Sequence, residues 1–160
     1  MKLRLLSPSL SSGDFCRSLV EQAPEAIIYA DIGRMIRFWN LSAERIFGFS
    51  AEEVLEKSLD MIIPKHLRQQ HWDAFTRTMR TGATRYGAGE VLAVPALRKD
   101  GTLISVEFSI SPFKDREGRM LGVAAILREM GKRREELSSL REEVAALRLQ
   151  LARLQQSPLG

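Results

Sequence analysis

The chain is poor in the residues that build covalent or metal-held frameworks. It has one cysteine, Cys16, and two histidines, His66 and His71, among 160 residues. A single thiol excludes an intrachain disulfide, and so few cysteines and histidines exclude the Cys/His clusters of structural zinc sites. Phe15 and Leu19 beside Cys16 predict a small buried or half-buried thiol. A hydrophobic core must therefore hold the fold together.

Long apolar runs are also missing. The uncharged apolar stretches are far shorter than the roughly 20 residues of a membrane-spanning helix. The first ten residues include two basic ones, but Ser7 and Pro8 interrupt the apolar stretch, so it makes a poor signal peptide. These absences predict a cytoplasmic protein with no membrane partner.

The charge pattern and the absence of catalytic motifs narrow the function further. The formal net charge is +4, and the arginines are scattered among acidic residues, which does not predict a nucleic-acid partner. No glycine loop could hold a phosphate, and no serine has a histidine at a suggestive position. Asp60, Asp73 and Glu107 are best interpreted as surface acids. The sequence thus predicts a binding or signalling protein and not an enzyme.

Hydrophobic periodicity and turn residues predict an α+β domain. An amphipathic helix (residues 11–22) precedes a hairpin of two strands, and Asn40 then caps a helix that ends at Gly48. A longer helix and three more strands follow, joined by turn sequences such as Lys99-Asp100-Gly101. We expect a five-stranded antiparallel sheet with helices on one face. The expected strands are 26–30, 35–39, 90–98, 102–111 and 120–128.

The longest helical pattern runs from Met61 to Gly82. Pro64 suits a helix start and Gly82 a helix end. Between them, one stripe at helical spacing is polar and a second is mostly apolar. The second stripe contains His71, and a buried imidazole must be hydrogen-bonded, for example to a backbone carbonyl, or bind something. The polar stripe comprises His66, Gln70, Asp73, Arg77 and Arg80, and the apolar stripe Leu67, His71, Ala74, Phe75 and Thr78.

Near the C-terminus the apolar spacing changes to alternating steps of three and four. Positions 137, 144 and 151 take the a places of a heptad repeat, and positions 140, 147 and 154 take the d places. Glu136 and Glu143 at g positions match Arg141 and Arg148 at the e positions of a parallel partner. The pattern predicts a coiled-coil helix within residues 131–160 and a homodimer. Its seam residues are Leu137, Leu140, Val144, Leu147, Leu151 and Leu154.

The segment before this helix resembles a PAS sensory domain. The resemblance is carried by Ala26-Ile27-Ile28-Tyr29-Ala30-Asp31, Phe38-Trp39-Asn40, Ile46-Phe47-Gly48-Phe49-Ser50-Ala51-Glu52-Glu53 and the turn Arg98-Lys99-Asp100-Gly101. Arg128-Glu129-Met130 is similar to the motif with which many PAS domains lead into an output helix, with glutamate in place of the family's aspartate. A PAS domain is expected at residues 19–130, after an N-terminal extension at 1–18.

Within PAS proteins, the central helix resembles the haem helix of the oxygen sensors of the FixL and direct-oxygen-sensor type. The matching residues are Ile63-Pro64, Arg68-Gln69-Gln70-His71, Phe75, Arg77, Thr81-Gly82 and Arg85. This resemblance implies a b-type haem with His71 as proximal iron ligand, Phe75 beside it, and Arg77 and Arg85 near the propionates. Such an arrangement is chemically coherent, because an apolar helix face offers one neutral imidazole to iron while cations at the rim neutralise two carboxylates.

The opposite wall of the implied haem site departs from the family. FixL-type sensors have an arginine at the start of the strand after the loop, and direct oxygen sensors place a methionine near there, but this region reads Gly87-Ala88-Gly89-Glu90-Val91. Phe108 and Ile110 match the apolar wall, Val91 belongs to the strand beside it, and the Tyr86 hydroxyl can donate to a ligand. The resemblance thus implies a sensor of O2, CO or NO, or of redox state, with five-coordinate or weakly six-coordinate ferrous iron.

Two other interpretations stay open. A cofactor-free PAS module for protein association would have the same fold and dimer, with the pocket filled by its own side chains. A flavin (FAD or FMN) would lie beside Trp39 and Asn40, which also occur in flavin-binding PAS domains, whereas covalent light sensors are excluded because the only thiol is Cys16. In each case the coiled coil would carry the signal to a downstream protein or effector domain that the sequence does not name.

Overall fold

The computed structural model describes residues 11–84, 91–131, 137 and 140–148. The chain divides into two compact units, Met1–Glu129 and Met130–Gly160, and each is described by itself. Among the described residues, no helix combines the length and the hydrophobicity needed to cross a membrane.

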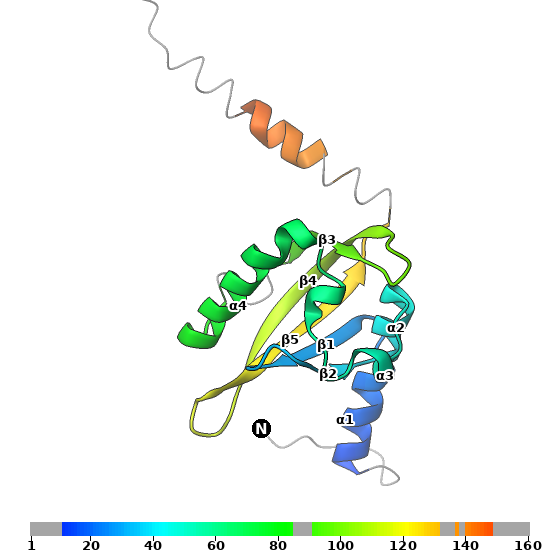
Figure 1. Cartoon of the computed structure of the whole chain (residues 1–160), viewed down its shortest axis with the longest axis vertical. Helices are drawn as coiled ribbons and strands as arrows, with labels where there is room; N and C mark the ends of the chain where they lie inside the picture. The colour runs from blue at the N-terminus through cyan, green and yellow to red at the C-terminus, as the bar shows by residue number, and fades with distance from the viewer. Residues whose placement is uncertain (1–10, 85–90, 132–136, 138–139, 149–160) are drawn as a thin grey trace, which may run out of the picture. The chain divides into compact units, whose positions relative to one another are not determined.

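The first unit is built on a five-stranded antiparallel sheet (Figure 1). Its strands are β1 (Ala26–Asp31), β2 (Ile36–Trp39), β3 (Leu92–Leu97), β4 (Leu103–Lys114) and β5 (Met120–Glu129). They lie in the order β2-β1-β5-β4-β3, so the last strand lies between the first hairpin and the second. The antiparallel sheet predicted from the sequence is confirmed, with β5 at its centre.

Two turns show how residues of left-handed conformation connect these strands. Between β3 and β4, Gly101 has φ 84°, a value that glycine adopts without a Cβ clash, and the Asp100 carboxylate accepts from the Thr102 amide at 2.8 Å. Between β1 and β2, Arg34 has φ 68° although it is not glycine. That conformation costs roughly 1 kcal/mol, which contacts of the side chain must offset.

The helices begin and end at residues suited to those places. α2 (Leu41–Phe47) starts at Asn40, whose side chain accepts from the Ala43 amide, and it ends at Gly48 with φ 77°. α3 (Ala51–Val54) has a capping box between Ser50 and Glu53. The remaining elements are α1 (Ser12–Glu21), the 3-10 helices η1 (Leu59–Met61) and η2 (Lys65–Leu67), and α4 (Arg68–Thr81).

The hydrophobic core lies on one face of the sheet. Side chains alternate along a strand, so Ile104, Val106 and Phe108 of β4 share a face with the residues opposite them in β3 and β5. This face packs against Phe47 of α2 and Val54 of α3, both fully buried. The helix-covered face therefore supplies the apolar surface beside which any bound group would lie.

Three sequence interpretations need correction. α4 begins at Arg68 and not at Pro64, because residues 65–67 form a 3-10 helix. Cys16 is exposed, because α1 buries none of its residues in the core. Glu107 is only 6% exposed and pairs with Arg128 on the neighbouring strand, so it is a buried, paired acid and not a surface one.

In the second unit, residue 137 and residues 140–148 are helical. The seam residues that fall within this part are exposed in the single chain: Leu137, Leu140, Val144 and Leu147. Leu151 and Leu154 lie outside the described residues. The described part of the seam is thus uncovered, and the coiled coil stays a prediction.

Candidate functional site

His71 lies on the buried face of α4. Phe75 and Thr78, one and two turns farther along, are 8% and 9% exposed, and His71 is half-buried. Ala74 is exposed, so the apolar stripe is narrower than predicted, but Leu67 is half-buried like His71 and lies one turn before it. The predicted polar stripe is exposed throughout: His66, Gln70, Asp73, Arg77 and Arg80.

The His71 imidazole makes no hydrogen bond within the described part of the chain. Its Nδ1 atom is buried without a partner, and its ring contacts Trp72 edge to face, with centroids 4.6 Å apart at 75°. Burial lowers the pKa of His71, while Asp60 opposes and Arg34 adds to that effect. The imidazole is therefore neutral at pH 7 and has a lone pair available for a ligand. The alternative, in which His71 is a core residue hydrogen-bonded to a backbone carbonyl, is not supported, because no such bond is present among the described residues.

The strands offer an apolar wall on their helix-covered face. Phe108 and Ile110 follow the buried Val106 at steps of two along β4, and both are half-buried. Val91 precedes β3 and is 53% exposed, whereas Leu92 lies opposite Phe108 in the ladder. The residue that belongs to this wall is thus Leu92 and not Val91, because only Leu92 shares the face of Phe108.

Of the two arginines expected near the haem propionates, only Arg77 lies among the described residues. Arg77 is exposed on α4, while Arg85 and Tyr86 lie outside the described residues. The helix ends at Gly82 with φ 64°, where a Cβ would come within 2.6 Å of the Lys114 Nζ. The Lys114 ammonium thus lies at the negative end of the α4 dipole, a contact that no sequence pattern indicated.

Sequence reasoning also missed Trp72 and its neighbours. Trp72 Nε1 donates to Asp60 Oδ1 at 2.7 Å, and the Arg34 guanidinium carbon lies 4.9 Å from the centroid of the same indole. Asp60 is therefore engaged and half-buried, and not only a surface acid. The adjacency of Trp72 to His71 was the one signal for this group, since its other members come from η1 and the β1–β2 turn.

Trp39 and Asn40, the residues considered for flavin, are buried and engaged with the backbone. Trp39 Nε1 donates to the Phe49 carbonyl at 3.2 Å. The Asn40 side chain accepts two hydrogen bonds and donates two, at 2.9 to 3.1 Å, with Ile27 N, Ala43 N, Val20 O and Glu25 O. An amide group satisfied in this way has no donor left for a flavin ring.

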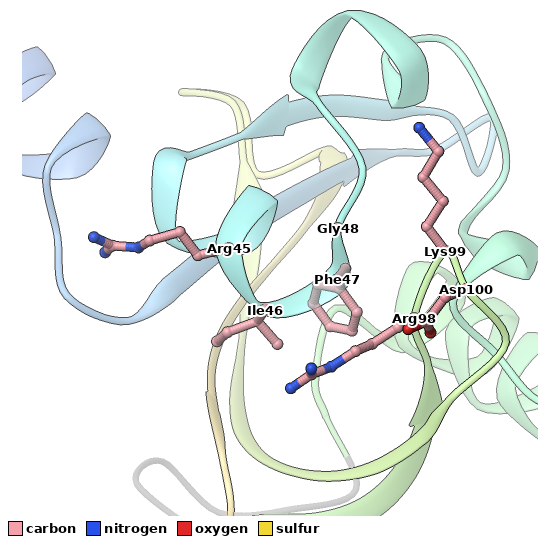
Figure 2. A pocket seen from close by; sticks show the side chains of 7 residues that line it. All are labelled: Arg45, Ile46, Phe47, Gly48, Arg98, Lys99 and Asp100. Carbon is pink, nitrogen blue, oxygen red and sulfur yellow. The ribbon is translucent and has the colours of Figure 1, made fainter.

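A separate groove of about 340 Å³ lies where α2 meets the β3–β4 turn (Figure 2). Figure 2 shows Arg98 extending toward Phe47 along this groove. Arg98 donates to both carboxylate oxygens of Glu129, at 2.6 and 2.7 Å, and Lys99 pairs with Glu53. Glu129 is the last residue of β5 and stands where the family motif has aspartate. Its carboxylate accepts from Arg98, so this position still carries a paired acid.

The donor set fits a haem better than a bare metal ion. The described residues include no group of three or more His, Cys, Asp or Glu side chains that could hold a metal ion. A haem iron needs few protein ligands, because the porphyrin supplies most of its coordination. One neutral imidazole with an unpartnered nitrogen, on the same helix face as the buried Phe75, meets that need.

The first unit is an α+β domain built on a five-stranded antiparallel sheet, and α4, the longest helix in the described part of the chain, carries a half-buried imidazole. The family model of the PAS fold matches residues 14–130. The chain belongs to the PAS family.

Two relatives carry the names of sensor proteins. The chain is 30% identical over 94 residues to the sensor protein FixL of Bradyrhizobium diazoefficiens, and 31% over 91 residues to the oxygen sensor protein DosP of Escherichia coli. These alignments cover 59% and 57% of this chain but only 18% and 11% of those proteins. The structure of an RNA-binding light-oxygen-voltage receptor superposes with a TM-score of 0.66 at 21% identity, over 91% of this chain and 40% of that one, which shows a shared fold.

Proposed function

We propose that this PAS domain senses a diatomic gas or a redox change through a b-type haem bound at His71, and that it is a sensor and not an enzyme. The observation that carries the proposal is the neutral imidazole on the buried face of α4, whose Nδ1 has no partner. An unsatisfied buried polar group costs about 1–3 kcal/mol, so its retention calls for an explanation such as a bound group. The similarity to FixL and DosP supports the same proposal.

Each side chain of the proposed site would have its own role in holding a haem. When bound, the haem would supply an iron centre that takes a diatomic ligand or changes oxidation state. His71 offers its imidazole without having to lose a proton at pH 7, because its pKa is lowered. Phe75 from the helix and Phe108 and Ile110 from the sheet would exclude water from the haem, and Arg77 with Arg85 would neutralise the propionates.

Tyr86 is the proposed donor to the bound ligand. The described wall residues Leu92, Phe108 and Ile110 carry no hydrogen-bond donor in their side chains. Bound O2 depends on such a donor more than CO does, so Tyr86→Phe should release O2 faster and leave CO release nearly unchanged. Equal O2 release from the two proteins would contradict this role.

The proposed output runs from the sheet into the C-terminal helix. Phe108 of the wall lies opposite Leu127 in β5, and β5 ends at Glu129 beside Arg98. A displacement of the wall would therefore reach the residues that lead into the heptads. If two packings of a dimeric coiled coil are close in energy, a small displacement selects between them. Cross-linking along 137, 144 and 151 that is identical with and without ligand would contradict this output.

The dimer itself can be tested apart from the haem. Sedimentation of the full chain should show a dimer, and Leu140→Lys with Leu147→Lys should convert it to a monomer because both residues lie on the seam. Ala146→Lys, on the outside of the heptad, is the matched control and should leave the dimer intact. A monomeric wild-type chain, or a dimer that survives the double substitution, would contradict the coiled coil.

Titration with haemin followed by absorption spectra tests the haem site. Wild type and His66→Ala should both give a sharp Soret band that saturates, whereas His71→Ala should lose it. His66 is a matched control, because it is the only other histidine in the chain and it is exposed. No specific band, or a band that survives in His71→Ala, would favour the cofactor-free module. An absorption band at about 450 nm with flavin fine structure would favour a flavin instead.

A further inference from the structure

Trp72 is held on several sides next to the proposed iron ligand. Its Nε1–H donates to Asp60 Oδ1 at 2.7 Å, and the Arg34 guanidinium lies over its ring. The indole contacts the His71 ring at 4.6 Å and the Phe75 ring at 5.5 Å, edge to face in both cases. The indole therefore has a fixed orientation, and one of its contacts is the His71 imidazole.

The two groups that hold the indole are themselves fixed. Asp60 lies in η1, where its amide donates to Ser58 Oγ at 3.2 Å and its carbonyl accepts from Arg68 Nη2 at 2.7 Å. Because Arg68 is the first residue of α4, these bonds join η1 to the helix that carries Trp72. The Asp60 carboxylate thus keeps its place relative to the indole.

Arg34 contacts the indole from the β1–β2 turn. Its Nη2 donates to Thr76 Oγ1 at 3.1 Å, and Thr76 is one helical turn beyond Trp72 on α4. The same guanidinium thus touches two neighbouring positions of the helix from the β1–β2 turn. These contacts help to offset the cost of the left-handed conformation at Arg34.

His71 lacks the restraint that usually orients a ligating histidine. The second ring nitrogen of such a residue normally bonds to a carboxylate, carbonyl or water, which fixes the ring. Neither ring nitrogen of His71 makes a hydrogen bond in the described part of the chain, so the nitrogen that does not bind iron leaves the ring unrestrained. The ring does lie edge to face against Trp72. An aromatic edge contact is worth about 0.5–1.5 kcal/mol, enough to favour one ring orientation over another.

We propose that Trp72, braced by Asp60 and Arg34, is a positioning residue that fixes the imidazole of His71 by ring contact in place of a hydrogen bond. The inference rests on the proposed haem function, since it assigns Trp72 a task toward the same ligand. The contacts of Asp60 and Arg34 also join α4 to η1 and to the β1–β2 turn. Movement of His71 is thereby coupled to segments outside α4.

Nuclear magnetic resonance of the haem-free full chain tests the contact directly. The chain has two histidines, so its imidazole spectrum is simple, and the exposed His66 serves as an internal reference. The His71 ring protons, assigned by their loss in His71→Gln, should be displaced by the ring current of Trp72. Trp72→Leu should return them toward the position of His66, whereas Trp72→Phe, which retains an aromatic ring, should keep part of the displacement.

Variants of Asp60 and Arg34 test whether Trp72 orients His71 or only packs against it. Asp60→Asn retains an acceptor oxygen for the indole and should leave the His71 signals in place, whereas Asp60→Ala and Arg34→Gln should broaden or shift them. Unchanged His71 signals in folded Trp72→Leu would overturn the proposal. If Trp72→Leu does not fold, the comparison of Asp60→Ala with Asp60→Asn decides, and equal spectra for that pair would overturn it.

The haem-loaded protein provides a second readout. Trp72→Leu should broaden the iron–histidine vibrational band and speed haem release by about tenfold, the lower range for loss of an outer partner of a metal ligand. Trp72→Phe should restore most of both properties. If the wild type binds no haem, the proposed function fails, yet the spectra of the haem-free chain still decide whether Trp72 orients His71.

Discussion

Two regions of the sensor domain treat a buried polar side chain in opposite ways. In the half built from β1, β2 and α2, Asn40 is 2% exposed and all of its hydrogen-bonding groups are used. On α4, His71 is half-buried and its Nδ1 has no partner. In the first region every polar group of the side chain is satisfied within the fold, whereas in the second an imidazole nitrogen is free to bind a ligand. This difference, more than the fold itself, points to where the domain binds something.

Asn40→Ala should produce the largest effect. It removes the α2 cap and leaves two amides and two carbonyls near the start of β1 without partners, so the free energy of unfolding should fall by about 3 kcal/mol or more. Urea denaturation followed by tryptophan fluorescence measures the change, because Trp39 next to it is buried. Asn40→Asp keeps both acceptor bonds and should lose less. Equal losses in the two variants would show that the accepted bonds, which only Asn40→Asp retains, contribute nothing.

Acidification should reveal the second region. The pKa of His71 is lowered in the folded state by burial, so between that pKa and the unfolded value of roughly 6.5 the unfolded chain binds more protons. Stability should therefore fall as the pH drops below about 6.5, by up to about 1.4 kcal/mol per pH unit. Denaturation of haem-free wild type and His71→Gln at several pH values isolates this component.

The carboxylates provide the background for that measurement. Burial acts to raise the pKa of Asp31, but hydrogen bonds from Arg37 and Met35 outweigh it and lower the pKa overall. A hydrogen bond from Lys99 lowers the pKa of Glu53. Their contributions are lost in more acidic solution, and they are common to both proteins. A difference between wild type and His71→Gln that stays constant from pH 8 to pH 5 would contradict a neutral, buried His71.

The same contrast explains what the sequence could predict. Local signals located the strands, the Asn40 cap and the Gly82 helix end, because each depends on a few neighbouring residues. The period of two in β4 also placed Phe108 and Ile110 together, whereas the β3 boundary was early and led to Val91 instead of Leu92. An error of one residue is enough to exchange the faces of a strand.

The parts of the site that the sequence did not predict depend on distant contacts. Trp72 is fixed by Asp60, which precedes α4, and by Arg34, which lies on another hairpin. Lys114 reaches the end of α4 from the β4–β5 hairpin. Periodicity within one helix cannot show which residues of other segments approach it. Glu107 was misjudged for the same reason, since its partner Arg128 lies on the neighbouring strand.

Glu129→Gln should have a small effect on stability and a larger one on output. Both hydrogen bonds of the Arg98–Glu129 pair come from one guanidinium nitrogen, Nη2, and the two side chains are 33% and 40% exposed. Solvent screening therefore limits the contribution of the pair to about 0.5–1 kcal/mol. Denaturation of the two proteins measures that loss. If the pair fixes the end of β5, from which the chain continues into the heptads, ligand-dependent cross-linking of the C-terminal heptads should weaken more than stability does. Unchanged cross-linking would assign the pair a purely structural role.

His71→Leu should have the smallest effect on the haem-free domain, which sharpens the contrast with Asn40. Leucine has a similar volume and no polar atom, so it removes an unsatisfied nitrogen from a half-buried apolar face, and the free energy of unfolding at pH 7.5 should change by less than about 0.5 kcal/mol or increase. Haem binding should be abolished in the same protein. Denaturation without haemin and a haemin titration measure the two properties separately. A loss of 2 kcal/mol or more in the haem-free protein (about the cost of breaking a satisfied buried hydrogen bond) would mean that the imidazole is held by the fold as Asn40 is, and the distinction between the two regions would then be lost.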